Sequence, residues 1–510
     1  MDKLIVLHRA ALRAKYGAQA LTKIDTALKA LVKADAKRGI DTRVIAADLA
    51  ATMKPFGVAP LPTPATARAL KTVIDALAKA RNPHYLVLIG GPDLLPMVAL
   101  KNPAPDDDDA DVPSDLPYAC EAAYSTDPNR FLGPTRVVGR LPDLPGAKDP
   151  ALLLSLIAAA TSHKPLPRDS YLESFGLSAE VWQDSTRMSL TNTFGSAEQL
   201  RLSPPSGPKW KKADLAPRMH FINCHGADHD PTYYGQRGRS YPEAMTSTTV
   251  KGLVTPGTVV AAECCYGAQV FAPTPDAKGN PGPWPISLRY LGDGAIAFVG
   301  STTVAYGPSA GNGSADLVCQ YFLQRVLAGA STGRALLEAR QKFAGERTHL
   351  DPVDLKTLAQ FYLLGDPSVQ PVTFQGHALA RTKAFKQAFS AVQDRGVRGL
   401  RRERLQREGQ NLARSLPRLQ PTDEAPAAAV VKAVTPMLRE SGLKPKDCRL
   451  VSYRIVGAPD HRTVHVYTAL RQVGKGEGAE GAKGDAALPL SLVATEQDGR
   501  LLHVRRMHAR

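Results

Sequence analysis

Cysteine, aromatic residues and long apolar runs are all scarce in this chain of 510 residues. Its six cysteines include no C-x-x-C pair, so we expect neither a disulfide scaffold nor a zinc site. For the same reason we expect the protein in a reducing compartment. No segment approaches the ~18 consecutive apolar residues that a membrane-spanning helix needs. The first residues, MDKLIVLHRA, place Lys3, His8 and Arg9 around a short apolar run and lack a small-residue cleavage site. We therefore expect a cytoplasmic protein that begins with a strand, has no signal peptide and has no membrane partner.

Negative charge is in short supply only in the last quarter of the chain. The sequence holds 64 lysines and arginines against 48 acidic residues, a formal charge of +16. From residue 376 onward, 25 basic residues stand against 13 acidic ones, so 12 of the 16 net charges lie in this tail. Five arginines crowd residues 398–407. They suit a regulatory protein partner or a polyanion such as nucleic acid, although no known nucleic-acid motif accompanies them. A solvated helix explains the same pattern more simply.

Short apolar runs alternate with amphipathic segments over the first 375 residues. The run Lys3–Leu7 precedes a stretch in which Leu21, Ile24, Leu28 and Leu31 are spaced as on one face of a helix. Repeated along the chain, this alternation predicts an α/β fold with doubly wound, mostly parallel sheets. A Pro-rich stretch near residue 166 divides the region in two. We expect an N-terminal α/β unit over 1–168, a second α/β unit over 169–375, an Arg-rich helical linker over 376–420 and a small α+β module over 421–510.

Two predicted strands of the second unit end in residues with reactive side chains. The apolar segment MHFIN leads to His225-Gly226, and TVVAA leads to Glu263-Cys264-Cys265. The intervening residues contain one predicted helix, over 242–253, so the two strands can be parallel neighbours. Active sites of open α/β sheets lie at the carboxyl ends of the strands. We therefore expect His225 and Cys264 at one edge of the sheet.

The pair fits nucleophilic catalysis. A Cys264 thiolate can attack a carbonyl, and the His225 imidazole can lower the pKa of the thiol and protonate the leaving amine. The N–H groups of Gly226 and Cys264 could hold the oxyanion. The alternative is that the cysteine is a small buried apolar residue and the histidine a core side chain. Cys264-Cys265 could also suggest a metal, but no partner cluster accompanies the pair.

Six segments together resemble the caspase-like cysteine peptidases, and among these the gingipain family. The resemblance covers roughly residues 1–375 in order and spacing, and it implies a peptidase with no cofactor that acts on proteins or peptides. The segments are YLVLIGGPDLLP (85–96), DVPSDLPYA…RVVGRLP (111–142), FINCHG (221–226), VVAAECCYG (259–267), GAIAFVGSTTVAYGP (294–308) and FYLLGDPSV (361–369).

The resemblance also implies roles for individual residues. The family's C-x-x-G spacing selects Cys264 over Cys265 as the nucleophile. Ser301, Thr302 and Tyr306 match positions that line the primary specificity pocket. Glu180, in GLSAEVW, matches an acidic residue that orients the histidine; otherwise it only favours the start of a helix.

Specificity for a basic P1 residue is a further expectation from the family. Asp184 and Asp228, with Asp230 as another candidate, could bind such a residue, or these could be solvated loop acids. The acidic run Asp106–Asp109 could attract calcium, but it lacks the EF-hand spacing and a solvated loop is the simpler explanation. An enzyme cleaving after Arg or Lys could process itself in the Arg-rich linker. The rival hypothesis is a catalytically inactive caspase-like scaffold whose basic module binds a partner protein or nucleic acid.

Overall fold

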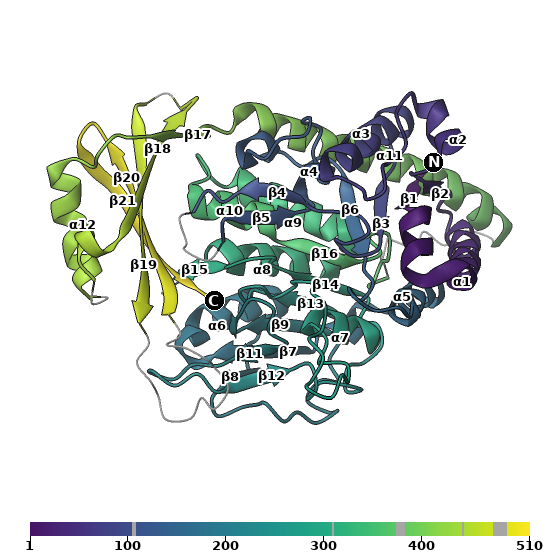
Figure 1. Ribbon diagram of the computed structural model, residues 1–510, viewed down its shortest axis with the longest axis horizontal. Coiled ribbons are helices and arrows are strands. Elements are labelled where there is room, and N and C mark those ends of the chain that lie inside the picture. The colour runs from purple at the N-terminus through teal and green to yellow at the C-terminus, as the bar shows by residue number, and fades with distance from the viewer. Residues whose placement is uncertain (105–108, 309–310, 374–382, 441–442, 459, 473–486) are drawn as a thin grey trace.

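A broad, mostly parallel sheet runs through the body of the protein, with helices on both sides (Figure 1). The computed structural model describes residues 1–104, 109–308, 311–373, 383–440, 443–458, 460–472 and 487–510. Asp106–Asp108 of the acidic run lie outside these ranges.

The main sheet has ten strands in the order β2-β1-β3-β6-β16-β14-β13-β9-β7-β8. All neighbouring pairs are parallel except β14 and β16, which run antiparallel. The predicted α/β class is therefore confirmed, and the two predicted units contribute to one continuous sheet that is joined where β16 pairs with β6. The strands are β1 Lys3–Leu7, β2 Thr42–Ala46, β3 Tyr85–Ile89, β6 Val137–Leu141, β7 Ser174–Ala179, β8 Leu200–Ser203, β9 Met219–Asn223, β13 Val259–Ala262, β14 Ala297–Gly300 and β16 Tyr362–Gly365.

Amphipathic helices cover the sheet because its central strands are buried on both faces. Contacts link α1, α5 and α7 in one group and α6, α8 and α9 in another, and Figure 1 shows the two groups on opposite sides of the strands. The helices are α1 Arg9–Lys37, α2 Ala50–Met53, α3 Ala67–Arg81, α4 Leu116–Ala119, α5 Ala151–Ser162, α6 Gln183–Phe194, α7 Ile286–Gly292, α8 Ser314–Leu327, α9 Thr332–Gly345 and α10 Pro352–Gln360. Within the described part of the chain, none of the helices has the length and apolarity to cross a membrane.

Buried ion pairs join β1 to the residues that directly follow β16. Lys3 Nζ lies 2.9 Å from a carboxylate oxygen of Asp35 and also pairs with Asp366, and all three side chains are buried. Asp366 belongs to the FYLLGDPSV segment, directly after β16. Removing one partner of such a group leaves an uncompensated buried charge, which costs about 3–5 kcal/mol. These contacts therefore couple residues that are more than 360 positions apart in the sequence.

The helix predicted over residues 242–253 is wrong. This region contains β12 Glu243–Thr246, which forms a three-stranded antiparallel sheet with β10 His225–Gly226 and β11 Thr232–Tyr234. The Thr-rich stretch after Met245 supplies the reason, because β-branched side chains favour strands and threonine hydroxyls bond to nearby main chain in turns. The Thr246 and Thr249 side chains bond to each other's main chain here.

The C-terminal module is a second, antiparallel sheet in the order β15-β21-β20-β19-β18-β17, with α12 Ala428–Glu440 packed on it. The β-rich end of the chain is a hairpin of β20 Ala487–Gln497 and β21 Arg500–Ala509. Asp498 and Gly499 both have positive φ, 51° and 77°, as a two-residue Asp-Gly hairpin turn requires. The remaining strands are β15 Tyr306–Pro308, β17 Arg418–Thr422, β18 Arg449–Val456 and β19 Arg462–Gln472.

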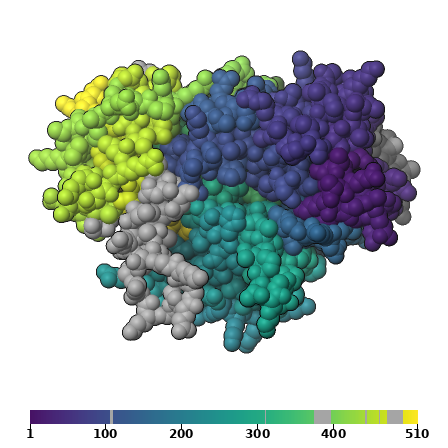
Figure 2. All heavy atoms as spheres, viewed as in Figure 1, coloured from purple at the N-terminus to yellow at the C-terminus, as the bar shows by residue number. Residues whose placement is uncertain are grey.

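The module is joined to the body through β21. Figure 2 shows the module as a lobe beside the body. β15 belongs to the body by sequence, yet among the described strands it pairs with β21, in the register Tyr306–Ala509, Gly307–His508 and Pro308–Met507. Arg510 therefore lies within the body, close to α6 and α8 (Figure 1).

Candidate active site

The predicted juxtaposition of the two strand ends is confirmed. β9 and β13 are parallel neighbours paired from Met219–Val259 to Ile222–Ala262, and the Glu263 N–H donates to the Ile222 carbonyl at 2.9 Å. Gly226 lies so close to the cysteine pair that a Cβ added to it would overlap the Cys265 carbonyl oxygen. Only glycine permits this approach of the two main chains.

Two main-chain N–H groups at this edge converge on one oxygen atom. The N–H of Cys265 donates to the main-chain oxygen of Arg510 at 3.0 Å, and the N–H of Gly226 donates to the same oxygen at 3.4 Å. Arg510 is the last residue of the sequence and follows β21. A pair of converging N–H donors is the arrangement that stabilises an oxyanion in acyl transfer.

The two cysteines of the pair face different surroundings. Cys264 Sγ is directed at the Ile222 carbonyl, 3.9 Å away, and lies wholly within the core. Cys265 Sγ lies against the main chain of Ala305, 3.4 Å from its oxygen and 3.3 Å from its nitrogen. Burial raises the pKa of the Cys264 thiol well above its usual range and that of Cys265 to about 12. Both thiols are therefore protonated at neutral pH in this arrangement.

His225 is held by a glutamine rather than by a carboxylate. Its Nε2 lies 2.8 Å from the Gln236 side-chain oxygen, while the amide nitrogen of Gln236 donates to the Gly238 carbonyl and to Tyr241. Because an amide oxygen only accepts, Nε2 carries the proton, and Nδ1 is the basic nitrogen. Nδ1 is buried and has no hydrogen-bond partner among the described residues.

The imidazole of His225 lies between aromatic rings. The Trp182 ring centroid is 4.3 Å from that of His225, and Tyr241 contacts it edge-on at 5.1 Å. Burial lowers the pKa of His225 to about 3; the Gln236 hydrogen bond opposes this shift, and the charges of Arg510 and His508 add to it. The neutral imidazole therefore prevails at neutral pH.

An acidic, aromatic pocket surrounds the side chain of Arg510, which is wholly buried. Its Nη2 lies 3.1 and 3.3 Å from the two carboxylate oxygens of Asp316 and 3.3 Å from the Pro308 carbonyl oxygen. The guanidinium carbon lies 4.5 Å from the Trp182 ring centroid, within cation–π range. A Cβ on Gly307 would overlap the guanidinium group. The pocket thus offers this side chain an acidic partner, a ring face and room at Gly307, while Nε and Nη1 have no hydrogen-bond partner among the described residues.

Glu263 adds a second acidic group to the pocket. It is fully buried, and its carboxyl group interacts with that of Asp316. Burial raises the pKa of Glu263 well above its usual range, the nearby Asp316 raises it further and Arg510 lowers it. Arg510 thus interacts with two acidic residues, one of which tends to bind a proton.

The three residues that the resemblance assigns to the specificity pocket lie around the site. The Ser301 hydroxyl donates to the Cys264 and Thr303 carbonyls, at 2.7 and 3.0 Å, and so supports the loop behind the cysteine pair. Thr302 donates to the Pro113 carbonyl of the N-terminal unit. Tyr306 is buried in β15, the strand that pairs with β21.

The acidic residues proposed from the family lie outside the Arg510 pocket. Glu180 forms an ion pair with Arg237, and no described contact joins it to His225. Asp184 is exposed in the first turn of α6. Asp228 is 57% exposed and accepts from Gln269, while Asp230 accepts from the Tyr234 hydroxyl. The structure instead brings Asp316 and Glu263 to the basic side chain.

Sequence reasoning overlooked four residues of this site, although two of them had a visible signal. Glu263 is a charged residue that directly precedes the cysteine pair at the end of an apolar strand. Trp182 closes the GLSAEVW segment in which only Glu180 was considered. Gln236 and Asp316 had no comparable signal, because both lie in segments that join the site only through tertiary packing.

The simple solvated-loop interpretation of the acidic run is wrong for Asp109. This residue is buried and forms an ion pair of 2.8 Å with Lys356, whose side chain is wholly buried. It also accepts from the Val304 N–H at 2.7 Å and from the Tyr266 hydroxyl at 2.9 Å. Asp109 therefore anchors the loops on either side of Cys265. Across the ranges that the structure describes, no three His, Cys, Asp or Glu side chains are grouped so as to hold a metal ion.

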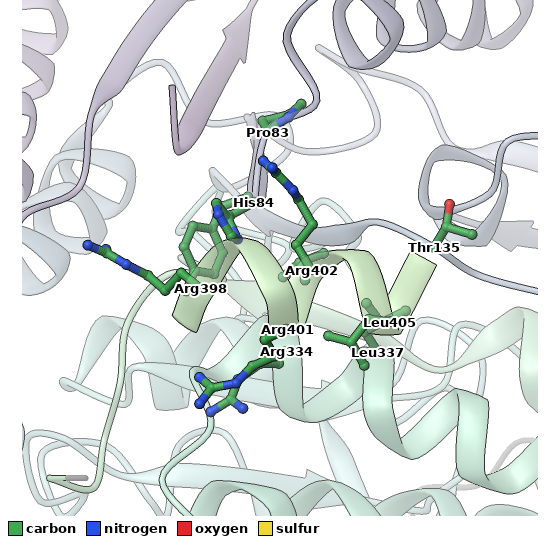
Figure 3. Close-up of a pocket in the computed structure, with 11 residues that line it drawn as sticks. Pro83, His84, Thr135, Arg334, Leu337, Arg398, Arg401, Arg402 and Leu405 are labelled. Atoms are coloured by element: carbon green, nitrogen blue, oxygen red, sulfur yellow. The ribbon is translucent and has the colours of Figure 1, made fainter. Parts of the chain in front are cut away.

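The Arg-rich segment is helical, as predicted, and is docked on the body. It forms α11 Lys383–Ser415, in which Arg398 donates to the Gly39 carbonyl at 2.9 Å and Arg402 to the Asn82 carbonyl at 2.5 Å. Figure 3 shows these two arginines beside His84 around a small hollow. The positive charge of this helix is therefore partly used in binding it to the N-terminal unit.

Comparisons with known proteins add little to this geometry. No protein-family model and no curated protein matches the chain. Among solved structures, one described as "Structure of Protease" superimposes with a TM-score of 0.47 at 15% sequence identity, over 100% of this chain and 97% of that chain.

Proposed function

We propose that this protein is a cysteine endopeptidase of caspase-like fold that cleaves peptide bonds after a basic residue. The observation that carries this proposal is the convergence of the Gly226 and Cys265 N–H groups on a main-chain oxygen, beside His225. A scissile carbonyl held in this position would have its developing negative charge stabilised by both donors.

The contacts favour Cys265 over Cys264 as the nucleophile. The N–H that points at the bound oxygen belongs to Cys265, and in a cysteine peptidase the nucleophile lies beside the oxyanion donors that its own main chain provides. Cys264 Sγ is directed into the core, toward β9. The spacing of Cys265 to Gly267 is C-x-G rather than the C-x-x-G on which the choice of Cys264 was based.

The reaction then follows from the roles of the named groups. His225, through Nδ1, takes the thiol proton of Cys265, and the thiolate attacks the scissile carbonyl to give a tetrahedral oxyanion held by the two N–H groups. Collapse breaks the C–N bond, and the imidazolium gives its proton to the leaving amine. Water, deprotonated by His225, then hydrolyses the thioester and regenerates the thiol. Gln236 fixes the tautomer that leaves Nδ1 free for these transfers.

Matched single-cysteine variants test this proposal. Hydrolysis of a fluorogenic peptide amide with Arg next to the leaving group is measured for the wild type, Cys265→Ala and Cys264→Ala. We expect Cys265→Ala to lose at least 10³-fold in kcat/KM and Cys264→Ala to retain activity. Loss only in Cys264→Ala would transfer the role to that residue. Absence of hydrolysis in every form, including those with the C-terminal residues altered, would favour the inactive scaffold.

Self-processing in the Arg-rich linker remains part of the proposal. Because residues 383–415 form a helix docked on the body, cleavage there requires local unfolding of α11. Mass spectrometry of the protein after incubation would reveal such cleavage.

A further inference from the structure

We infer that Trp182, Glu263, Gly307 and Asp316 form a binding site specific for the arginine side chain of an extended peptide, and that the protein's own strand β21 occupies it. A substrate can therefore enter only when residues 507–510 leave. The role of the occupied cleft in binding substrate rests on the function proposed above. The arginine pocket itself does not depend on that function.

The main chain of β21 is bound as an added strand. Ala509, His508 and Met507 pair antiparallel with β15, and the Arg510 N–H donates to the Ala305 carbonyl at 2.9 Å. The Arg510 oxygen then lies between the Gly226 and Cys265 N–H groups. Strand addition of this kind binds a peptide through its main chain, and pockets for alternate side chains supply the specificity. The segment is therefore held as a peptide with Arg510 at the P1 position.

The pocket selects arginine by the form of the guanidinium group. Both oxygens of Asp316 lie within 3.3 Å of one guanidinium nitrogen, the Trp182 ring faces the planar group, and the absence of a side chain on Gly307 leaves room for it. A planar, delocalised cation suits a ring face and several acceptors at once, whereas lysine offers a compact point charge. Glu263 is buried close enough to interact electrostatically with Arg510 and Asp316.

The end of β21 excludes other peptides from the cleft because most of its side chains are buried there. Met507, Ala509 and Arg510 are each no more than 2% exposed. Being part of the same chain, β21 also has a high effective concentration at the cleft, which a free peptide must overcome. The protonated thiols of Cys264 and Cys265 are those of the occupied state.

A binding experiment tests the pocket without relying on catalysis. The probe is a fluorescein-labelled peptide with the sequence of residues 501–510, LLHVRRMHAR, and the receptor is a variant lacking residues 507–510. Fluorescence anisotropy should show binding to this variant and at least tenfold weaker binding to the full chain. Replacing the final Arg of the peptide by Ala should weaken binding at least 100-fold, and by Lys at least tenfold. Asp316→Asn in the receptor should weaken binding of the Arg peptide at least tenfold.

Equal binding of the Arg-ended and Ala-ended peptides would overturn the pocket, and equal binding to the truncated and full-length forms would overturn its occupation by β21. If the truncated form does not fold, as judged by circular dichroism, full-length Arg510→Gln replaces it. In that variant, hydrogen exchange at residues 507–509 should rise at least tenfold. The matched control is Arg500→Gln, at the exposed far end of the same strand; equal exchange in the two variants would refute the inference.

An activity measurement separates this inference from the proposed function. Arg510→Gln should raise kcat/KM for an Arg peptide amide at least tenfold over the wild type, while Arg500→Gln should leave it unchanged. Binding without hydrolysis in any variant would keep the pocket and reject the peptidase. Hydrolysis that is indifferent to Arg510, with no binding of the peptide, would reject the pocket and keep the peptidase.

Discussion

The close approach of Gly307 to the guanidinium group of Arg510 allows the pocket to be altered without touching the cysteine or the histidine. In Gly307→Ala, the new methyl group would overlap Nη2, Nε and Cζ of Arg510. Restoring ordinary contact, at about 3.5 Å, requires the guanidinium to move by roughly 1 Å or more. The hydrogen bonds of 3.1 and 3.3 Å to Asp316 cannot survive that movement.

The magnitude follows from the burial of this ion pair. Both side chains are wholly buried, and breaking a buried pair costs about 3–5 kcal/mol. At about 1.4 kcal/mol for each factor of ten, an arginine substrate should lose roughly 10²- to 4 × 10³-fold in kcat/KM. The main-chain site is unchanged, so the loss should fall mainly on KM.

The assay compares kcat/KM for two peptide amides, one with Arg and one with Ala next to the leaving group, in Gly307→Ala and in Gly399→Ala. Gly399 lies in α11, and a Cβ there meets no atom within 4 Å, so it controls for the exchange of glycine itself. Both variants are measured with Arg510→Gln added, so that β21 does not mask the cleft. An unchanged preference for Arg over Ala in Gly307→Ala would refute this reasoning.

Three further predictions concern the surroundings of the site. Gln236→Leu should lower kcat at least tenfold with little change in KM, because the tautomer of His225 is no longer set; equal activity across pH 6–8 would contradict this role. Since the pKa of His225 is about 3 against an ordinary 6.5, the folded state resists protonation that the unfolded chain accepts. The free energy of unfolding should therefore fall as the pH drops from about 6.5 toward 3, less so in His225→Asn, as urea denaturation at pH 7 and pH 4.5 would measure. Asp109→Asn should lower the free energy of unfolding by about 3–5 kcal/mol through loss of its buried pair with Lys356, and an unchanged melting temperature would be inconsistent with that contact.

Apolar periodicity determined most of the regular structure. Strands such as Lys3–Leu7 and helices such as Ser314–Leu327 were predictable because each carries its own pattern of buried positions. The same local logic placed His225 and the cysteine pair at one edge of the sheet, since parallel strands present their carboxyl ends together. It failed at residues 242–253, where a Thr-rich segment without clear periodicity forms β12 and tertiary pairing with β11 decided the outcome.

Only the tertiary structure determines which side chains and N–H groups form the proposed site. In the sequence, only the spacing to a glycine distinguishes Cys264 from Cys265 as the nucleophile. Which N–H group and which thiol face the cleft depends on the turn after β13. Asp316 lies in the first turn of α8, and Arg510 is 194 positions away from it. Nothing local brings such residues together, because their attraction is realised only after two sheets have formed and excluded water from the pocket between them. The sequence by itself thus determined that a cysteine pair and a histidine meet at one edge of the sheet. Only the tertiary structure placed Arg510, which follows β21, against them.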